Sequence, residues 1–217
     1  MNFDYLIDNW REVLALTWDH IQLSGTALIL ALVVAIPLGV IVAARRQWRL
    51  PVLIVLGAIY TIPSLAFLAF LIPSLGLGRQ PALVVLAAYA QLALVRNFSA
   101  GLAGVNTLTM EAAVGAGMTR LQAFLKVRLP LALPVLIAGL RIAAVSTISL
   151  ATITAWINAG GLGTLLFEGI TFDNPSMILA GTVAIAILAL TVDLVFRGVE
   201  QITPAARATR ASHAPAR

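Results

Sequence analysis

The chain has 217 residues, of which 60% are hydrophobic and 11% are charged, and its mean hydropathy is +0.98. A soluble domain carries roughly 25% charged residues, so this composition excludes a globular protein whose surface faces water on all sides. The absence of cysteine excludes disulfides and thiolate metal sites. The net charge of +5 is interpreted through membrane orientation rather than nucleic-acid binding.

The first twenty residues are acidic, whereas a secretory signal peptide begins with positive charge. We therefore expect an uncleaved anchor and assign residues 1–20 to an extracytoplasmic N-terminal segment. Apolar side chains recur there at helical spacing, namely Tyr5, Leu6, Trp10, Val13 and Leu14. Two arrangements stay open: an interfacial helix lying on the membrane, or an extension of the first transmembrane helix.

Long apolar stretches without Asp, Glu, Lys or Arg predict transmembrane helices, because about 20 apolar residues cross a bilayer. Barrel strands would be shorter and alternating. The expected spans lie near 22–44, 50–72, 81–95 with a continuation toward 104, 142–167 and 178–196. The start of the fourth is open, since 131–140 is also apolar. The sequence thus predicts an all-α polytopic membrane protein of about five transmembrane helices, with a transmembrane domain over 21–200 and a disordered cytoplasmic tail over 201–217.

The second span is interrupted by Pro63, with Thr61 and Ser64 beside it. One interpretation is a tolerated kink in which the hydroxyls satisfy the freed carbonyls. The other is a flexible wall of a transport pathway. The sequence does not separate the two.

Aromatic side chains in or beside the spans can hold a cationic group by cation–π attraction. The candidates are Tyr60, Phe67, Tyr89, Phe98 and Trp156. We favour the simpler interpretation that these rings face lipid or the core. Tyr60 and Trp156, together with Pro63 and Ser64, are retained as pathway candidates.

The segment between the third and fourth spans begins like a helix. Thr107 or Thr109 can cap it, and Glu111 would then lie near the positive end of the helix dipole. Ala112 and Ala113 favour helix and add little bulk. Small residues on a short cytoplasmic helix form a surface on which another protein can dock.

Further along this segment, Gly117 indicates a bend or a close approach of two backbones. Pro130 stops one helix or starts the next. We expect two short cytoplasmic helices that meet at Gly117. Their apolar contacts with the bilayer would come from Leu121, Phe124, Leu125 and Leu129.

Three glycines within four residues interrupt the outer end of the fourth span: Gly160, Gly161 and Gly163. Outside the membrane a plain turn would suffice. At membrane depth such backbone must be buried in protein or line a cavity. Because Leu162 and the residues that follow are apolar, we favour a re-entrant, gate-like element over 158–163.

The remaining polar residues predict no enzyme. Asp193 and Arg197 are four apart and predict a helical ion pair near the cytoplasmic interface. His20 and His213 are isolated, so no metal site is expected. The chain has no phosphate-binding loop of the form Gly-x4-Gly-Lys-Ser/Thr, and no cofactor is expected. Any ATP hydrolysis would belong to another polypeptide.

Lys and Arg divide unequally between the two sides of the predicted bundle. Only Arg11 and Arg79 fall on the side of the N-terminus, whereas the other twelve of the fourteen fall on the side of the C-terminus. The positive-inside rule then predicts a cytoplasmic C-terminus and an outside N-terminus. An odd number of spans is needed to keep this division.

One spacing resembles a known family. Glu111-Ala112-Ala113, three residues, Gly117, nine residues and then Val127-Arg128-Leu129-Pro130 resemble the EAA loop of ABC-importer permeases, with Val127 where that family usually has Ile. Over roughly 20–200, further segments resemble the permeases for glycine betaine, carnitine and choline: Thr-Ile-Pro-Ser-Leu-Ala at 61–66, Arg96-Asn97, Gly-Met-Thr at 117–119 and Ala-Gly-Gly-Leu-Gly at 159–163. Methionine permeases share a similar Gly-Gly-Leu-Gly segment and a five-span layout.

The resemblance implies a permease subunit of a type I importer in a prokaryotic cytoplasmic (inner) membrane. Two permease subunits, identical or homologous, would form the path within the lipid bilayer. An ABC ATPase subunit would receive a coupling helix over 108–119, and the matched positions are Glu111, Ala112, Ala113, Gly117, Leu129 and Pro130. A separate extracytoplasmic protein would bind the solute, since the chain ends at 217 without room for such a domain. No nucleic-acid partner is implied.

Two solute classes stay open on this reading. The first is quaternary-amine osmoprotectants, and the alternative is methionine or another small solute carried by an importer of the same architecture. An intramembrane enzyme is disfavoured because the chain has no His-Glu-x-x-His motif and no paired aspartates within spans. A channel would need no coupling helix.

Overall fold

The computed structural model describes residues 4–203, and all regular structure within them is helical. The elements are α1 (Asp4–Asp8), α2 (Trp10–Ala44), α3 (Arg46–Thr61), α4 (Ser64–Leu75), α5 (Arg79–Ala103), α6 (Thr107–Gly115), α7 (Arg120–Ala123), a π turn (Phe124–Arg128), α8 (Leu129–Thr154), a 3-10 turn (Ala155–Ile157), α9 (Gly163–Thr171) and α10 (Pro175–Gln201). The predicted tail from residue 204 on, with His213, lies outside the described residues.

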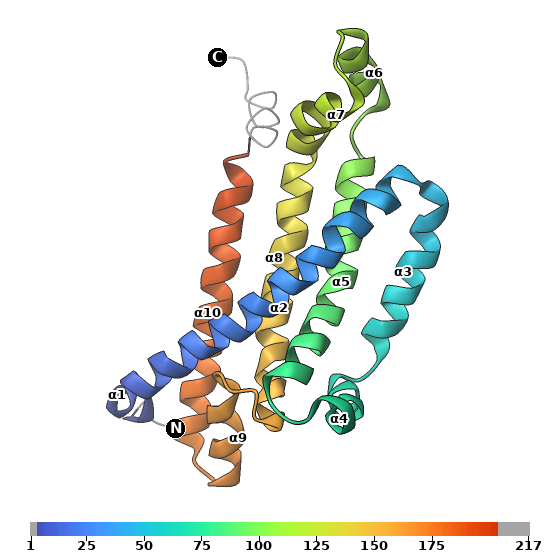
Figure 1. The fold of residues 1–217 in the computed structure, drawn as a ribbon. Coiled ribbons are helices and arrows are strands. Elements are labelled where there is room, and N and C mark those ends of the chain that lie inside the picture. Colours follow the sequence, from blue (N-terminus) through green and yellow to red (C-terminus); the bar gives the residue numbers. More distant parts are fainter. Residues whose placement is uncertain (1–3, 204–217) are drawn as a thin grey trace, which may run out of the picture.

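Five helices run between the two ends of the molecule (Figure 1): α2, α3, α5, α8 and α10. Four helical stretches are long and apolar enough to cross a membrane, and the bent pair α3–α4 is a fifth. The prediction of an all-α bundle with about five spans is therefore confirmed. We call the end that carries α6 and α7 the knob end, and the opposite end, with α4 and α9, the loop end (Figure 1).

Helix α2 answers the question left open for the N-terminal segment. It runs without interruption over 35 residues, which is about 52 Å at 1.5 Å per residue. A hydrocarbon core is only about 30 Å thick. Trp10 and Val13 therefore belong to an extension of the first span, and α2 crosses the other long helices obliquely (Figure 1).

Small residues bring α2 and α5 close together. A buried stripe with a spacing of four runs along α2, formed by Leu23, Ala27, Ala31, Ala35 and Gly39. A Cβ added at Gly39 would lie 2.8 Å from the Cβ of Phe98 on α5. Apolar packing gives little net gain in lipid, so membrane helices associate through close backbone approach of this kind.

Close contact at glycine residues also joins α5 to α8. A Cβ added at Gly139 of α8 would overlap the Cβ of Asn97, and one added at Gly101 of α5 would lie 3.1 Å from the Cβ of Val135. The Asn97 amide donates to the carbonyl of Ala93 in its own helix, 2.8 Å away. Helix α5 is thus fixed between α2 and α8.

The second span differs from the predicted 50–72. Helix α3 ends at Thr61, α4 starts at Ser64, and the two axes meet at 88°. Pro63 lacks the N–H that would continue the helix, and it holds Ile62 in an extended conformation. Helix α3 alone is about 24 Å long, which is shorter than the hydrocarbon core. A turn of 88° is a break in the second span rather than the tolerated kink that one interpretation expected.

The structure settles the open start of the fourth span and corrects its end. Helix α8 starts at Leu129, so it includes the apolar 131–140 stretch, and it ends at Thr154 rather than at 167. Arg141 lies inside the helix because its guanidinium reaches Asp193 of α10, with a 3.5 Å separation. The Arg197 Nε donates to the same carboxylate at 2.6 Å, as the four-residue spacing predicted.

The close contact at Gly139 makes a stability prediction. Gly139→Ala should lower the melting temperature of the purified protein in detergent, because overpacking of this kind costs about 1–3 kcal/mol. Gly25→Ala in α2 is the matched control, since nothing lies within 4 Å of its added Cβ, and alanine is the better helix former by about 1 kcal/mol. Equal melting temperatures for the two variants would contradict the packing account.

Candidate functional site

The knob is the segment 106–123, which projects from the bundle at the knob end (Figure 1). Its first helix is capped by Asn106 rather than by Thr107 or Thr109: the Asn106 Oδ1 accepts from the N–H of Leu108 at 2.9 Å. The helix ends at Gly115, four residues before the predicted end of the coupling helix. Asparagine is among the strongest N-cap residues, so the capping signal was present in the sequence at Asn106, one position before Thr107.

Gly117 closes the first knob helix in a Schellman motif. It adopts φ +90°, its N–H donates to the carbonyl of Val114 at 2.9 Å, and the N–H of Met118 donates to Ala113 at 3.2 Å. The predicted bend is thereby observed. Nothing in the described chain lies within 4 Å of a Cβ built on Gly117, so no close backbone approach exists there within this chain.

The second knob helix starts with a capping box. The N–H of Thr119 donates to the Gln122 Oε1 at 2.9 Å, and the N–H of Gln122 donates to the Thr119 Oγ1 at 3.3 Å. The turn between the knob helices therefore satisfies its own backbone groups. Its shape is therefore fixed by bonds within the turn itself.

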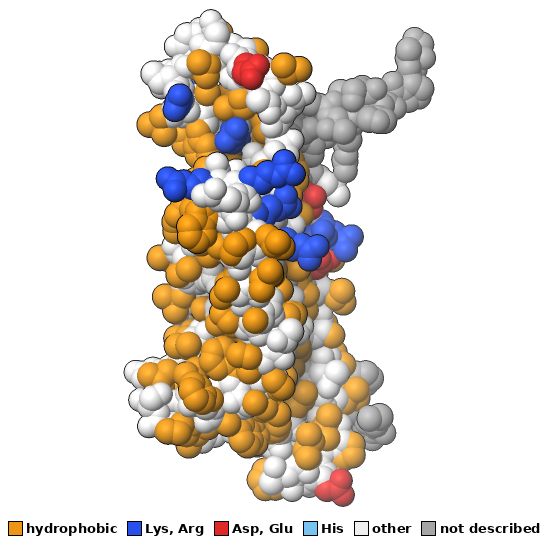
Figure 2. Space-filling model, turned by 90° about the vertical axis from the view of Figure 1, so that its right-hand side faces the viewer, with side chains coloured by type: hydrophobic (Ala, Val, Ile, Leu, Met, Phe, Trp, Pro, Cys, Tyr) orange, Lys and Arg blue, Asp and Glu red, His pale blue; other side chains and the backbone are white. Residues whose placement is uncertain are grey.

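The knob presents small and apolar side chains to its surroundings. Leu108 is 71% exposed, and Val114 and Leu121 are also exposed. Ala113 is buried, whereas Ala112 and Glu111 face outward, and no described residue bonds to the Glu111 carboxylate. Figure 2 shows Lys and Arg gathered in a band just below this end and a largely hydrophobic surface beneath it.

The knob is continuous with α8. From Arg120 to Ile157 the chain forms one helical stretch of 38 residues, in which a π turn and the first turn of α8, with Leu129 and Pro130, connect smoothly. The interpretation in which Pro130 starts a helix is the one observed. The chain therefore passes from the second knob helix to the loop end without leaving the helix.

The glycine loop is the segment 158–162, between the 3-10 turn and α9. Asn158, Gly160 and Gly161 all have positive φ, between 61° and 84°. Ala159 and Leu162 are buried, and Gly163 begins α9 where a Cβ would overlap the carbonyl oxygen of Thr152. The segment is thus packed against protein and is not a free surface turn.

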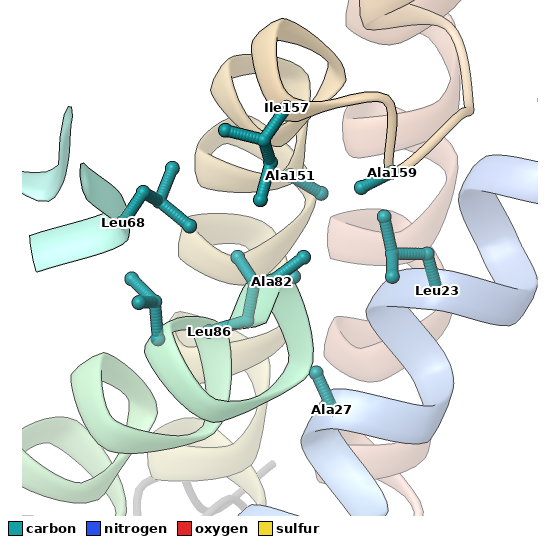
Figure 3. Close-up of a cluster of buried hydrophobic side chains, with 9 residues drawn as sticks. Leu23, Ala27, Leu68, Ala82, Leu86, Ala151, Ile157 and Ala159 are labelled. Carbon is teal, nitrogen blue, oxygen red and sulfur yellow. The ribbon is translucent and has the colours of Figure 1, made fainter. Parts of the chain in front are cut away.

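Figure 3 shows the apolar cluster that receives this loop, in which Ala159 faces Leu23 of α2. Ile157, Leu68 of α4 and Leu86 of α5 complete its centre. The carbonyl of Ile157 also accepts from the N–H of Gly78 at 2.7 Å. The loop is therefore packed against residues of α2, α4, α5 and the 3-10 turn.

Two polar residues on α2 bond to the loop, and the sequence did not point to either. The Asp19 Oδ2 accepts from the N–H of Gly161 at 2.9 Å, and the His20 Nδ1 accepts from the N–H of Leu162 at 3.2 Å. His20 is fully buried, which corrects the reading of it as an isolated residue. The partners are 142 positions apart in the chain, so no local pattern could reveal the contact.

An aromatic cleft of about 330 Å³ lies between α3, α5 and α8. The ring centroids of Tyr60 and Tyr89 are 5.5 Å apart, and those of Phe67 and Tyr89 are 6.3 Å apart. The opposite wall carries hydroxyl groups of Ser146 and Ser149. A second cleft of about 420 Å³ shares Tyr60 and Ser146 with the first, and extends to Arg96 and Asn97.

The break in the second span adjoins this cleft. The Tyr89 hydroxyl donates to the carbonyl of Ile62, and the Thr61 Oγ1 donates to the carbonyl of Ala58 at 2.7 Å. Of the two hydroxyl groups expected to satisfy freed carbonyls, that of Thr61 does so, and the Tyr89 hydroxyl supplies the other bond. Pro63 and Ser64 form the corner itself and do not line the cleft.

The other aromatic candidates lie elsewhere. Phe98 is buried between α5 and α2. Trp156 is exposed and lines a separate cleft of about 490 Å³ at the loop end, with Asn158, Gly160 and Glu168. The structure therefore brings three of the five rings together and separates Trp156 from Tyr60.

Comparison with known proteins gives one consistent result. Residues 35–203 match the family described as binding-protein-dependent transport system inner membrane component. The chain is 40% identical over 202 residues to the choline transport system permease protein OpuBB of Bacillus subtilis, with 93% of each chain covered. It is 38% identical to the carnitine transport permease protein OpuCB of Listeria monocytogenes, with 92% of each covered.

The solved structures agree on the fold. An inward-facing MetNI methionine ABC transporter superposes with a TM-score of 0.78 at 22% identity, covering 88% of this chain and 95% of that one. An amino acid ABC transporter superposes with a TM-score of 0.72 at 16% identity, covering 93% and 98%. The fold is that of type I ABC importer permeases, and the relatives are transport subunits rather than enzymes. The chain belongs to the family of binding-protein-dependent transport system inner membrane components.

Proposed function

We propose that this chain is the permease subunit of an ATP-driven importer for quaternary-amine osmoprotectants such as glycine betaine, choline and carnitine. The observation that carries the proposal is the knob: a self-capped pair of helices, continuous with a long apolar helix, that matches the EAA spacing. The solute class is supported by relatives 38–40% identical over nearly the whole chain, whose names specify choline and carnitine.

The knob end is cytoplasmic in this proposal, and the loop end faces outward. The support is electrostatic, because the Lys and Arg residues concentrate at the knob end (Figure 2) and cytoplasmic loops carry an excess of these residues. The C-terminus is then cytoplasmic and the N-terminus outside. A separate binding protein delivers the solute at the loop end.

The knob docks into a groove on a separate ABC ATPase. Ala112 and Ala113 allow close approach of the ATPase, and Glu111 offers a carboxylate to which no described residue is bonded. Gly117 lets the knob turn sharply enough to form a compact plug, while Leu129 and Pro130 begin the rod that transmits its motion. No described atom lies within 4 Å of a Cβ built on Gly117, so the surface at this residue is open to a partner.

The aromatic cleft is one wall of the solute path, and a second permease subunit forms the other. The cleft opens on the surface of this chain between α3 and α8, so a facing subunit is needed to enclose a solute. Tyr60 belongs to this wall, with Pro63 and Ser64 at its outer corner. Trp156 lies at the outer mouth beside the glycine loop, whose residues Gly160, Gly161, Leu162 and Gly163 form the gate.

Transport then follows alternating access between two states of the bundle. ATP binding brings the two ATPase subunits together and displaces the docked knobs. Each knob moves α8 as a rod, and the loop end rearranges so that the path opens toward the binding protein. Hydrolysis and product release return the path to its inward-open state.

A methionine importer is the second candidate, and its support is weaker. The methionine transporter superposes well, but at 22% identity that likeness concerns the fold alone. The aromatic cleft offers ring faces, which attract a quaternary ammonium group more than a thioether.

The central test is uptake by the reconstituted complex of this permease, its ATPase and its binding protein in proteoliposomes. With ATP inside, we expect accumulation of at least one of labelled glycine betaine, choline and carnitine, and none of methionine. ATP-dependent accumulation of methionine alone would overturn the proposed solute class while leaving the importer architecture in place.

Gly117 separates docking from folding. Gly117→Trp should leave insertion and the bundle intact, because no described atom lies within 4 Å of its Cβ position, but the ATPase recovered with it should fall about tenfold or more. Any L side chain is strained at φ +90°, so Gly117→Ala is the matched control: it carries the same backbone strain with little bulk, and should retain most of the ATPase. Full ATPase recovery and uptake with Gly117→Trp would count against the knob as the docking element.

The aromatic cleft makes a prediction on transport alone. Tyr60→Leu should reduce uptake of a quaternary amine about three- to thirtyfold, because a cation–π contact contributes about 0.5–2 kcal/mol. Phe70→Leu on α4 is the control, as Phe70 is exposed and lies outside the cleft. Equal uptake rates in the two variants, at equal amounts of assembled complex, would remove Tyr60 from the path.

A further inference from the structure

We propose that Asp19 and His20 are positioning residues for the gate: together they hold the glycine loop in its buried, closed form. The role of this loop as a gate rests on the proposed function, whereas the positioning role is argued from contacts within this chain. Two adjacent residues of α2 accept hydrogen bonds from two adjacent N–H groups of the loop, those of Gly161 and Leu162.

His20 ties the loop to α2 and α8 at once. Its Nδ1 accepts from the N–H of Leu162 at 3.2 Å, which requires that this nitrogen carries no proton. Its Nε2 then carries the proton and donates to the carbonyl of Ile148 at 2.9 Å. The ring is fully buried and uses both nitrogens, so it fixes the loop relative to two long helices.

Asp19 makes a second, different connection. One carboxylate oxygen accepts from the N–H of Gly161, and the other pairs with the guanidinium of Arg79 at the start of α5. The ion pair is partly exposed, and exposed pairs contribute little to stability. The backbone bond to the loop is therefore the part of this contact that we expect to matter.

The glycines of the loop fit around these two side chains. A Cβ on Gly160 would overlap the Asp19 Oδ2, and one on Gly161 would lie 2.8 Å from the His20 Nδ1. Both residues also need positive φ. The loop and the two polar residues are thus complementary in shape as well as in hydrogen bonding.

A purely structural role is the competing explanation, since a buried histidine can simply join two helices. The partners here argue for more. Of the three carbonyl and N–H groups that Asp19 and His20 engage, two belong to the non-helical loop and only one, that of Ile148, belongs to a helix. Removing these side chains should therefore loosen the loop before it loosens the bundle.

The absence of cysteine gives a direct measurement. Ala159→Cys places the only thiol of the chain in the loop, at a site that is 1% exposed. In the assembled complex in nanodiscs, where both faces are accessible, a hydrophilic maleimide should label this thiol slowly. Phe172→Cys, at a position that is 71% exposed at the end of α9, reports the rate for a thiol that needs no opening.

Four variants in the Ala159→Cys background test the assignment. Asp19→Ala and His20→Ala should each raise the labelling rate about tenfold, the change expected from losing a buried hydrogen bond. Asp19→Asn keeps an acceptor oxygen for Gly161 and should raise it much less. Arg79→Gln removes only the ion pair and should leave the rate close to that of the parent.

Unchanged labelling in both Asp19→Ala and His20→Ala, in complexes that assemble normally, would overturn the proposal. An increase with Arg79→Gln as large as with Asp19→Ala would also overturn it, because the ion pair rather than the loop contact would then hold the segment. Asp19→Ala serves if His20→Ala fails to fold, since the Asp19 side chain is only partly buried.

The labelling needs neither ATP nor solute, so its outcome is independent of the solute class. Uptake in the same complexes tests the link to the gate. Faster labelling together with ATP hydrolysis that is less well coupled to uptake supports the gate role. Faster labelling with unchanged uptake and hydrolysis would refute the loop as the gate, and would refute that part of the proposed function with it.

Discussion

The constraint on which this structure depends is that backbone polar groups in hydrocarbon must be satisfied within the protein. The described chain is helical almost throughout and leaves the helix at only a few places that matter for function. At the break after α3 and at the glycine loop, side chains replace the lost helical bonds: Tyr89 at the first, and Asp19 with His20 at the second. The knob, which is proposed to lie outside the hydrocarbon, satisfies its own backbone groups with a Schellman motif and a capping box.

These segments are mechanically linked. The knob and the glycine loop stand at opposite ends of one helical stretch, Arg120–Ile157, which joins the region proposed to receive force to the region proposed to open. Small residues pack this rod closely against α5, and Arg141 ties it to α10 through Asp193. A bundle joined by close backbone contacts and a few polar ties moves as discrete bodies, because packed interfaces do not deform continuously.

Much of this architecture could be predicted from charge-free stretches, because crossing a bilayer demands them. Charge-free stretches did not indicate that Arg141 lies inside a helix, because its partner Asp193 is on another element. They also did not show that the chain turns by 88° at Pro63 instead of kinking there. The knob was largely predictable because capping is local in sequence. His20 was not, since its meaning comes from contacts with Leu162 and Ile148 that only the tertiary fold creates.

The chemistry of the clefts bears on how a permanently charged solute would pass. Among the described residues, no Asp or Glu lines either of the two clefts that share Tyr60. In the first cleft an ammonium group would meet ring faces and hydroxyl groups instead of a carboxylate. The second cleft also carries Arg96, whose positive charge would repel such a group. A cation–π contact contributes about 0.5–2 kcal/mol, whereas a desolvated ion pair would hold the solute far more firmly. A path has to release what it admits, so weak aromatic contacts suit conduction, and tight selection is better placed in the partner that delivers the solute.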